Sequence, residues 1–389
     1  MSRFLKSMIV LLAIVAMATP VMAEDMLSLG GQMRVRGWYV GDFDGSVGGS
    51  DSTNTWLDQR LRIGGKFSIA DGVSVTFRTD VTEKNWGDGG NTYGAGRLPQ
   101  DGMQWDRAHM DLTFDTFSLR AGQQYIQFGQ NTPFNAQDAG FKIATKGAVP
   151  VTAFFMLADD NGTYADGFYY GANVGFGADA VKGNFYVVGQ SKVSNSDENV
   201  YLIGADTTFN MDAFKLVAEL DFFTGDANAT TDAFGTQLFL DGSMSADAMT
   251  FGAQLFYALG DTDDAQYDVL GNDFNGWDPL FAHGTGLDDE QIMLGRPYTF
   301  FGSGAGVVAG RIYVDTKVSD AVNLGASISY LEPEEDAVTD ADSAMTVAVG
   351  MKYAVMSNTS LGVLVEYIDI DEPEVDADFA AGVGLFVNF

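Results

Sequence analysis

Basic residues recur at every second position in the first third of the chain. Arg34 and Arg36 have this spacing, as do Arg60 and Arg62. Arginine stays charged at any physiological pH, and its planar guanidinium group binds oxyanions through paired hydrogen bonds. We expect a basic wall along which an anion passes from one site to the next. The members of this predicted basic wall are Arg34, Arg36, Arg60, Arg62, Lys66, Arg78, Arg107 and Arg120.

Acidic residues with the same alternation accompany the basic wall. Asp58, Asp80 and Asp111 lie on the same predicted strands as the arginines. They permit a second interpretation, in which the ladder of charges is structural and only keeps an interior polar. A further set is expected on the opposite side of that interior, and consists of Asp206, Glu219, Asp221, Asp315 and Glu366.

Catalytic chemistry finds little support in the sequence. The chain has two histidines, His109 and His283, and no cysteine. His109 lies near Asp111, but no serine on that strand completes a triad. No metal-binding or nucleotide-binding spacing occurs. We therefore predict that the chain is not an enzyme and uses neither a cofactor nor a metal.

Strands of about ten residues are needed to position these side chains, because alternate residues of a strand share one face. The pattern predicts eighteen such strands between residues 29 and 389, with sixteen as the alternative. The weakest stretch is 140–158, which is counted as two strands, about 140–146 and 150–158, with one strand or an inward-folded loop as the alternatives. Short connections such as Ala70-Asp71-Gly72 alternate with long ones such as 41–54 and 85–103. This alternation predicts an all-β transmembrane antiparallel barrel with short periplasmic turns and long external loops.

The first 23 residues read as a secretory signal peptide. Arg3 and Lys6 precede an apolar run from Met8 to Ala18, and cleavage is expected after Ala23. Residues 24–389 then form a single barrel domain. The formal net charge of the whole chain is −32, with 21 basic and 53 acidic residues. Removing Arg3 and Lys6 leaves 19 against 53, or −34, which argues against a nucleic-acid partner.

The last stretch, Asp378 to Phe389, carries apolar residues at every second position and ends on an aromatic residue. As an open edge it would invite aggregation, so we expect it to pair with the first strand and to close the barrel.

With its signal peptide, alternating strands and terminal Phe389, the chain resembles the porins of the Gram-negative outer membrane. The segments Trp56 to Arg62, Leu119 to Gln124 and Asp278 to His283 also resemble the eighteen-stranded alginate-export-type channels, whose pore is rich in arginine. The resemblance implies a bacterial outer-membrane location and a homotrimer. It further implies lipid and lipopolysaccharide as neighbours, and a barrel-assembly machinery that recognises Phe389.

Three functions are compatible with this sequence. The first is a porin for passive diffusion of small hydrophilic solutes and ions. The second is a channel for export or uptake of an anionic polysaccharide or oligosaccharide, and the third is a non-conducting structural or adhesion barrel. The narrowest point of a channel would come from the connection between Gly260 and Ala305 or from residues 129–139. Acidic runs in the loops, such as Glu334-Glu335-Asp336, are interpreted as solvated surface or as sites for divalent cations.

Overall fold

The alternation in the sequence forms long strands whose two faces differ in polarity. The computed structural model describes residues 26–41, 54–86, 103–130, 133–159, 166–178, 180–193, 196–260, 265–267, 269–271, 287, 300–301, 304–335, 341–371 and 377–389. The predicted signal peptide and His283 lie outside these ranges. No helix within them is long and apolar enough to cross a membrane.

The described residues contain nineteen strands. They are β1 (Leu27–Val40), β2 (Asn54–Ala70), β3 (Val73–Asn85), β4 (Gln104–Thr113), β5 (Phe117–Phe128), β6 (Phe134–Thr145), β7 (Val151–Asp159), β8 (Gly167–Ala178), β9 (Val181–Ser191), β10 (Asn199–Met211), β11 (Phe214–Asp226), β12 (Asp232–Ala246), β13 (Met249–Ala258), β14 (Ala265–Gln266), β15 (Val307–Lys317), β16 (Val322–Glu332), β17 (Ser343–Met356), β18 (Thr359–Asp371) and β19 (Asp378–Asn388).

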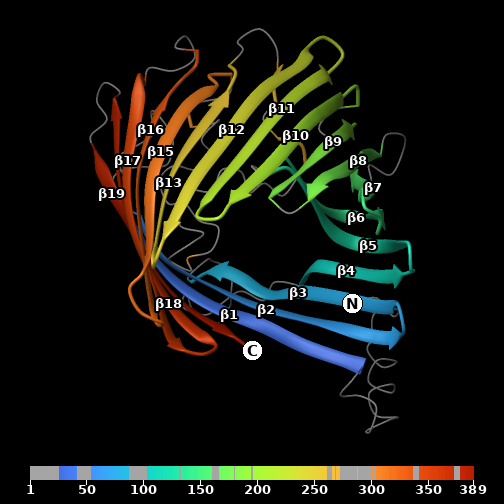
Figure 1. Cartoon of the computed structure of the whole chain (residues 1–389), viewed down its shortest axis with the longest axis horizontal. Helices are drawn as coiled ribbons and strands as arrows, with labels where there is room; N and C mark the ends of the chain where they lie inside the picture. The colour runs from blue at the N-terminus through green and yellow to red at the C-terminus, as the bar shows by residue number, and fades with distance from the viewer. Residues whose placement is uncertain are drawn as a thin grey trace, which may run out of the picture.

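The sheet formed by these strands closes on itself (Figure 1). Neighbouring strands pair antiparallel, and β19 returns to β1 with Val35 opposite Leu385. The two-residue β14 is not one of the strands that close the barrel. β13 pairs directly with β15, and β14 pairs in parallel with β12. The remaining eighteen strands form a barrel, which confirms the prediction of eighteen rather than sixteen. In Figure 1, the blue strands β1–β3 face the green and yellow strands β10–β12 across it.

Short and long connections alternate around most of the ring, as predicted, and the exception is at β6, where residues 129–133 and 146–150 form connections of equal length. Residues 71–72 join β2 to β3 and residues 247–248 join β12 to β13. Gly72 and Asp247 have φ angles of 73° and 53°, the left-handed conformation that a tight turn requires. At the other end, residues 41–53 join β1 to β2 and residues 259–306 separate β13 from β15.

The outer face of the barrel is apolar. Phe141, Ile312 and Val383 are 60%, 61% and 47% exposed, whereas the charged residues Arg34 and Asp221 on the inner face are 4% and 0% exposed. Such an apolar outer surface fits hydrocarbon, in which closed pairing also satisfies every backbone polar group.

The structure decides the ambiguous stretch at 140–158. It contains parts of two strands, β6 and β7, joined by residues 146–150. β6 begins at Phe134, six residues before the predicted start at 140. The predicted connection 129–139 was therefore too long, because only residues 129–133 separate β5 from β6. Pairing of Phe128 with Phe134 extends the ladder to the last residue of β5.

Candidate functional site

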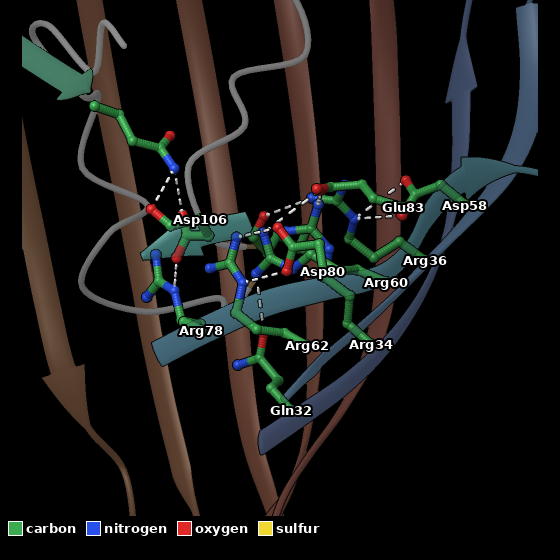
Figure 2. Close-up of polar contacts among 12 residues, drawn as sticks. Gln32, Arg34, Arg36, Asp58, Arg60, Arg62, Arg78, Asp80, Glu83 and Asp106 are labelled. Carbon is green, nitrogen blue, oxygen red and sulfur yellow. Dashed lines mark hydrogen bonds and ion pairs between the residues drawn. The ribbon is translucent and has the colours of Figure 1, made fainter. Parts of the chain in front are cut away.

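The basic wall lies on β1 to β5, where strand pairing brings arginines of neighbouring strands side by side (Figure 2). Arg34 on β1 is directly opposite Arg60 on β2, and Arg60 is directly opposite Glu83 on β3. The Oε1 atom of Glu83 lies 2.7 Å from Nη2 of Arg34 and 3.5 Å from Nη1 of Arg60. Like charges that face each other across strands are destabilising, so the bridging carboxylate stabilises this row.

A second row repeats the arrangement on the next strands. Arg78 on β3 is directly opposite Arg107 on β4, and Asp106 forms an ion pair with Arg78 and lies 3.8 Å from Nε of Arg107. The hydroxyl group of Tyr125 and the side-chain amide of Gln137 donate to Oδ1 of Asp106 at 2.8 and 2.9 Å. Asp106 is consequently only 4% exposed.

Two β-bulges deliver the bridging carboxylates to the interior. Val81 on β3 has no partner on β2, and Asp106 on β4 has no partner on β3. An extra residue shifts the alternation of the strand by one. Strict alternation from Asp80 would point Glu83 outward, and strict alternation from Arg107 would point Asp106 outward. The sequence therefore did not identify Glu83 or Asp106 as site residues.

The three predicted acidic partners of the basic wall each contact an arginine. Asp80 accepts two hydrogen bonds from Arg62, at 2.6 and 2.9 Å, and Asp111 lies 2.6 Å from Nε of Arg120. Nε2 of His109 is 3.5 Å from Asp111. His109 is thus part of the charged ladder, and it also contacts the backbone of β5.

The third of these partners, Asp58, forms the most enclosed pair of the wall. Its Oδ1 lies 3.0 Å from Nε of Arg36, and the side chains of Arg36 and Asp58 are 3% and 10% exposed. The indole N–H group of Trp38 donates to Oδ2 of Asp58 at 2.6 Å. The Arg36 guanidinium also lies 5.1 Å from the centre of the Trp38 ring.

Positive charge exceeds negative charge along this wall. Among the described residues, the ion pairs join seven arginines to five carboxylates, because Glu83 and Asp106 each contact two arginines. Lys142, which the sequence reasoning missed, lies on β6 directly opposite Arg120. In the described part of the chain, neither Lys142 nor the predicted Lys66 forms an ion pair. The weak strand pattern at 140–158 explains why Lys142 was not assigned to the wall.

Three of the predicted acidic residues meet on the far side of the barrel. Asp206 on β10 is directly opposite Glu219 on β11, and Asp221 follows on β11. Gln130, from the β5–β6 connection, contacts Glu219 and Asp206. Its backbone N–H donates to Glu219, and its side chain donates to Asp206 at 3.1 Å. The Tyr186 hydroxyl donates to Asp221 at 2.6 Å. The structure places the other two predicted acidic residues, Asp315 and Glu366, apart from this group on β15 and β18.

Described parts of the β13–β15 connection lie inside the barrel. The backbone N–H of Tyr267 donates to the carbonyl of Phe234 on β12 at 2.8 Å, and its hydroxyl donates to Glu198 at 3.0 Å. Leu270 is fully buried in a cluster that includes Phe134. Burial and the negative charge of Glu198 raise the pKa of Tyr267, so its hydroxyl remains a donor at neutral pH.

A second piece of this connection reaches β1 and β19. The carbonyl of Leu287 accepts a long hydrogen bond from Nη1 of Arg36 at 3.5 Å. The Leu287 side chain is buried with Trp38 and Phe386, and a methyl group at Gly384 would come within 2.9 Å of it. The small inward-facing residues of the last strand therefore leave room for this segment. Described residues of both connections predicted as candidates for the narrowest point therefore lie in the barrel interior.

A polar cavity of about 580 Å³ adjoins the two bridged rows. It is lined by Arg60, Arg62, Arg78, Asp80, Glu83, Gln104, Trp105, Asp106, Arg107, Tyr125, Gln127, Asn135 and Gln137. The described residues contain no group of three or more His, Cys, Asp or Glu side chains arranged to hold a metal ion. The guanidinium groups beside this cavity are suited to electrostatic binding of a passing solute.

Comparison with known proteins identifies the family. Residues 10–373 match the family model of the Gram-negative porins. The chain belongs to the Gram-negative porin family. This porin is a transmembrane β-barrel of the bacterial outer membrane and a channel for small solutes, not an enzyme. A search of curated proteins found no match.

Solved porin structures share the fold of this porin at low identity. OccK9 (OpdG) of Pseudomonas aeruginosa is similar with a TM-score of 0.65 and 13% identity, over 93% of this chain and 98% of its own. A BenF-like porin of Pseudomonas fluorescens Pf-5 gives 0.64 and 11%, over 93% and 98%. OccAB4 of Acinetobacter baumannii gives 0.61 and 12%, over 95% and 100%. At these identities the likeness extends to the fold and not to the solute.

Proposed function

We propose that this porin passes small hydrophilic solutes and ions by passive diffusion along the basic wall, with a preference for anions. The unequal exposure of opposite charges supports this proposal. The side chains of Arg62, Arg78 and Arg107 are 20%, 25% and 38% exposed. Asp206 and Glu219, across the barrel, are only 3% and 2% exposed. A solute in the lumen therefore meets accessible guanidinium groups, with Glu83, whose side chain is 45% exposed, as an accessible carboxylate among them. Such charges set selectivity in pores.

A structural role for the alternating charges of the basic wall is compatible with a role in anion passage. Paired guanidinium groups hold neighbouring strands together, while their excess over the carboxylates remains available to a solute. Of the predicted pore-lining acidic residues, Asp58, Asp80 and Asp111 then act as partners that fix the arginines, whereas Asp206, Glu219 and Asp221 are enclosed on the far side of the barrel.

Selectivity measurements on a double variant test the proposal. In planar bilayers with a potassium chloride gradient, the reversal potential of the wild-type porin should indicate anion preference. Arg60→Ala combined with Arg62→Ala leaves Glu83 and Asp80 with fewer partners in the lumen, so the potential should move toward cations. Lys215→Ala combined with Lys317→Ala, which removes two charges beside the short turns, serves as a control. An unchanged potential in the first variant would contradict a pore-lining role for the wall.

The same recordings separate the alternative functions. Block of the current by an anionic oligosaccharide at low concentration would favour a polysaccharide channel. Absence of any conductance from folded protein would favour a structural or adhesion barrel. Steady conductance without such block is the result expected for passive diffusion.

The predicted partners also belong to this proposal. We propose that residues 1–23 direct secretion, that the barrel-assembly machinery recognises Phe389, and that the porin is a homotrimer beside lipopolysaccharide. The apolar outer face and the closing strand that ends on Phe389 support the assembly role. Cross-linking of the purified porin tests the trimer.

A further inference from the structure

We propose that Glu83 is a displaceable internal counter-ion, which occupies the site between Arg34 and Arg60 until the anionic group of a passing solute replaces it. This inference rests on the proposed passage of anions along the basic wall. It makes Glu83 a residue that determines selectivity, in addition to the arginines themselves.

The two bridged rows have the same design, but their carboxylates are held differently. Asp106 is 4% exposed and accepts hydrogen bonds from Tyr125 and Gln137 besides its arginines. The Glu83 side chain is 45% exposed, and its ion pairs within the described residues are with Arg34 and Arg60, while Arg62 interacts with it electrostatically. Asp106 is therefore fixed, whereas Glu83 can turn into the lumen without breaking other bonds.

The arginines of the Glu83 row are the fixed half of the site. Their side chains are 5% and 10% exposed for Arg34 and Arg60. Nη2 of Arg60 donates to Oε1 of Gln32 at 3.0 Å, which holds the guanidinium in place when Glu83 leaves. Figure 2 shows Glu83 across from Arg34 and Arg60 in this row. Two adjacent buried cations require an anion, so a solute oxyanion and Glu83 compete for one position.

The position of Glu83 in the fold favours exchange. It lies three residues before Trp86, where β3 leaves the barrel, and after the bulge at Val81. Glu83 also borders the polar cavity of about 580 Å³, as does Arg60. A displaced carboxylate and an incoming solute therefore share the same solvent-filled space.

Substitution of Glu83 separates displacement from simple charge. The measured quantity is the acetate-to-potassium permeability ratio, from the reversal potential in a potassium acetate gradient. Glu83→Gln removes the competitor and should raise the ratio about fivefold, the factor expected for two unit charges about 4 Å apart in water. The control is Asp241→Asn on β12, which removes one carboxylate that accepts a hydrogen bond from Tyr313 at 2.9 Å. It should change the ratio much less.

A charge-preserving variant gives the sharper result. Glu83→Asp keeps the charge but shortens the side chain by one methylene, so it bridges the two arginines poorly and should raise the ratio to an intermediate value. A ratio equal to wild type in Glu83→Asp, or a rise in Glu83→Gln no larger than in Asp241→Asn, would overturn the proposal. If the double variant at Arg60 and Arg62 shifts the reversal potential while Glu83→Gln does not, the anion path stands and only the displacement fails.

Discussion

Asp58 holds two neighbouring side chains of β1 at once. Its carboxylate accepts from Nε of Arg36 at 3.0 and 3.1 Å and from the indole of Trp38 at 2.6 Å. Without Asp58, the Arg36 charge would remain in a nearly enclosed position. Removal of one member of a buried ion pair is more destabilising than the absence of the whole pair.

We therefore expect Asp58→Ala to lower the free energy of unfolding by about 3–5 kcal/mol. The urea midpoint of unfolding, followed by tryptophan fluorescence in detergent, provides the measurement. Asp320→Asn is a suitable control, because Asp320 pairs with Lys317 at 2.8 Å in an exposed turn. A similar midpoint for both variants would show that the Arg36 pair does not stabilise the barrel.

Individual residues of the site could be predicted only where the strands are regular. Alternation correctly predicted that Asp58, Asp80 and Asp111 accompany the arginines. It missed Glu83 and Asp106, since a bulge depends on how two strands pair and leaves no clear mark in one strand.

At the scale of the elements, the β13–β15 connection is held against the barrel wall by a small number of polar bonds. Glu198 accepts from Tyr267 at 3.0 Å and from Gln190 at 2.7 Å, and Gly271 donates to Gln190 at 3.2 Å. Apolar packing of Leu270 complements these bonds. Removal of one such bond should loosen the segment without unfolding the barrel, because the ring of strands does not depend on it.

Tyr267→Phe tests this attachment. Loss of a hydrogen bond to a carboxylate weakens the attachment by about 1.5–3 kcal/mol, so the segment should leave the wall more often. Single-channel recordings should show larger or more variable conductance than wild type. Tyr257→Phe removes a comparable bond, from Tyr257 to Glu334 at 3.1 Å, at the rim. Equal conductance in wild type and Tyr267→Phe would mean that this segment does not narrow the channel.

The strands could be predicted well from the sequence, but the long connection could not. Strand alternation reflects two environments, lipid and lumen, that act on every strand alike. The position of the described residues of the β13–β15 connection depends instead on particular contacts, such as Leu287 with Gly384 and Tyr267 with Glu198. Composition gave no indication of which parts would turn inward.

The whole molecule depends on the seam between β1 and β19. Phe389 completes it: its backbone N–H donates to the carbonyl of Gly31 at 3.0 Å, and its carbonyl accepts from Gly31 at 2.8 Å. The aromatic ring is 61% exposed on the outer face. The sequence predicted this closure correctly, because an apolar terminal strand requires a partner.

Deletion of Phe389 should reduce the amount of assembled porin in the outer membrane several-fold, while secretion continues. Two backbone hydrogen bonds of the seam and the exposed terminal ring are lost together. Immunoblots of outer-membrane and periplasmic fractions provide the measurement. Phe379→Ala is the matched control, because Phe379 lies on the same strand and outer face, where it stacks on Tyr39 at 5.1 Å. Normal levels of the truncated porin would contradict the proposed role of Phe389.

The bulge at Val81 shifts by one residue the alternation of inward-facing and outward-facing side chains along β3. Below it, the alternation that gives Arg78 and Asp80 to the interior is intact; above it, the opposite set of residues faces the interior, beginning with Glu83. One inserted residue therefore changes which side chains face the lumen between the bulge and the nearby end of β3, and leaves the rest of the strand unaltered. By the same reasoning, a single-residue insertion or deletion near a strand end is expected to change the charges at that end of the channel without substitution of any arginine.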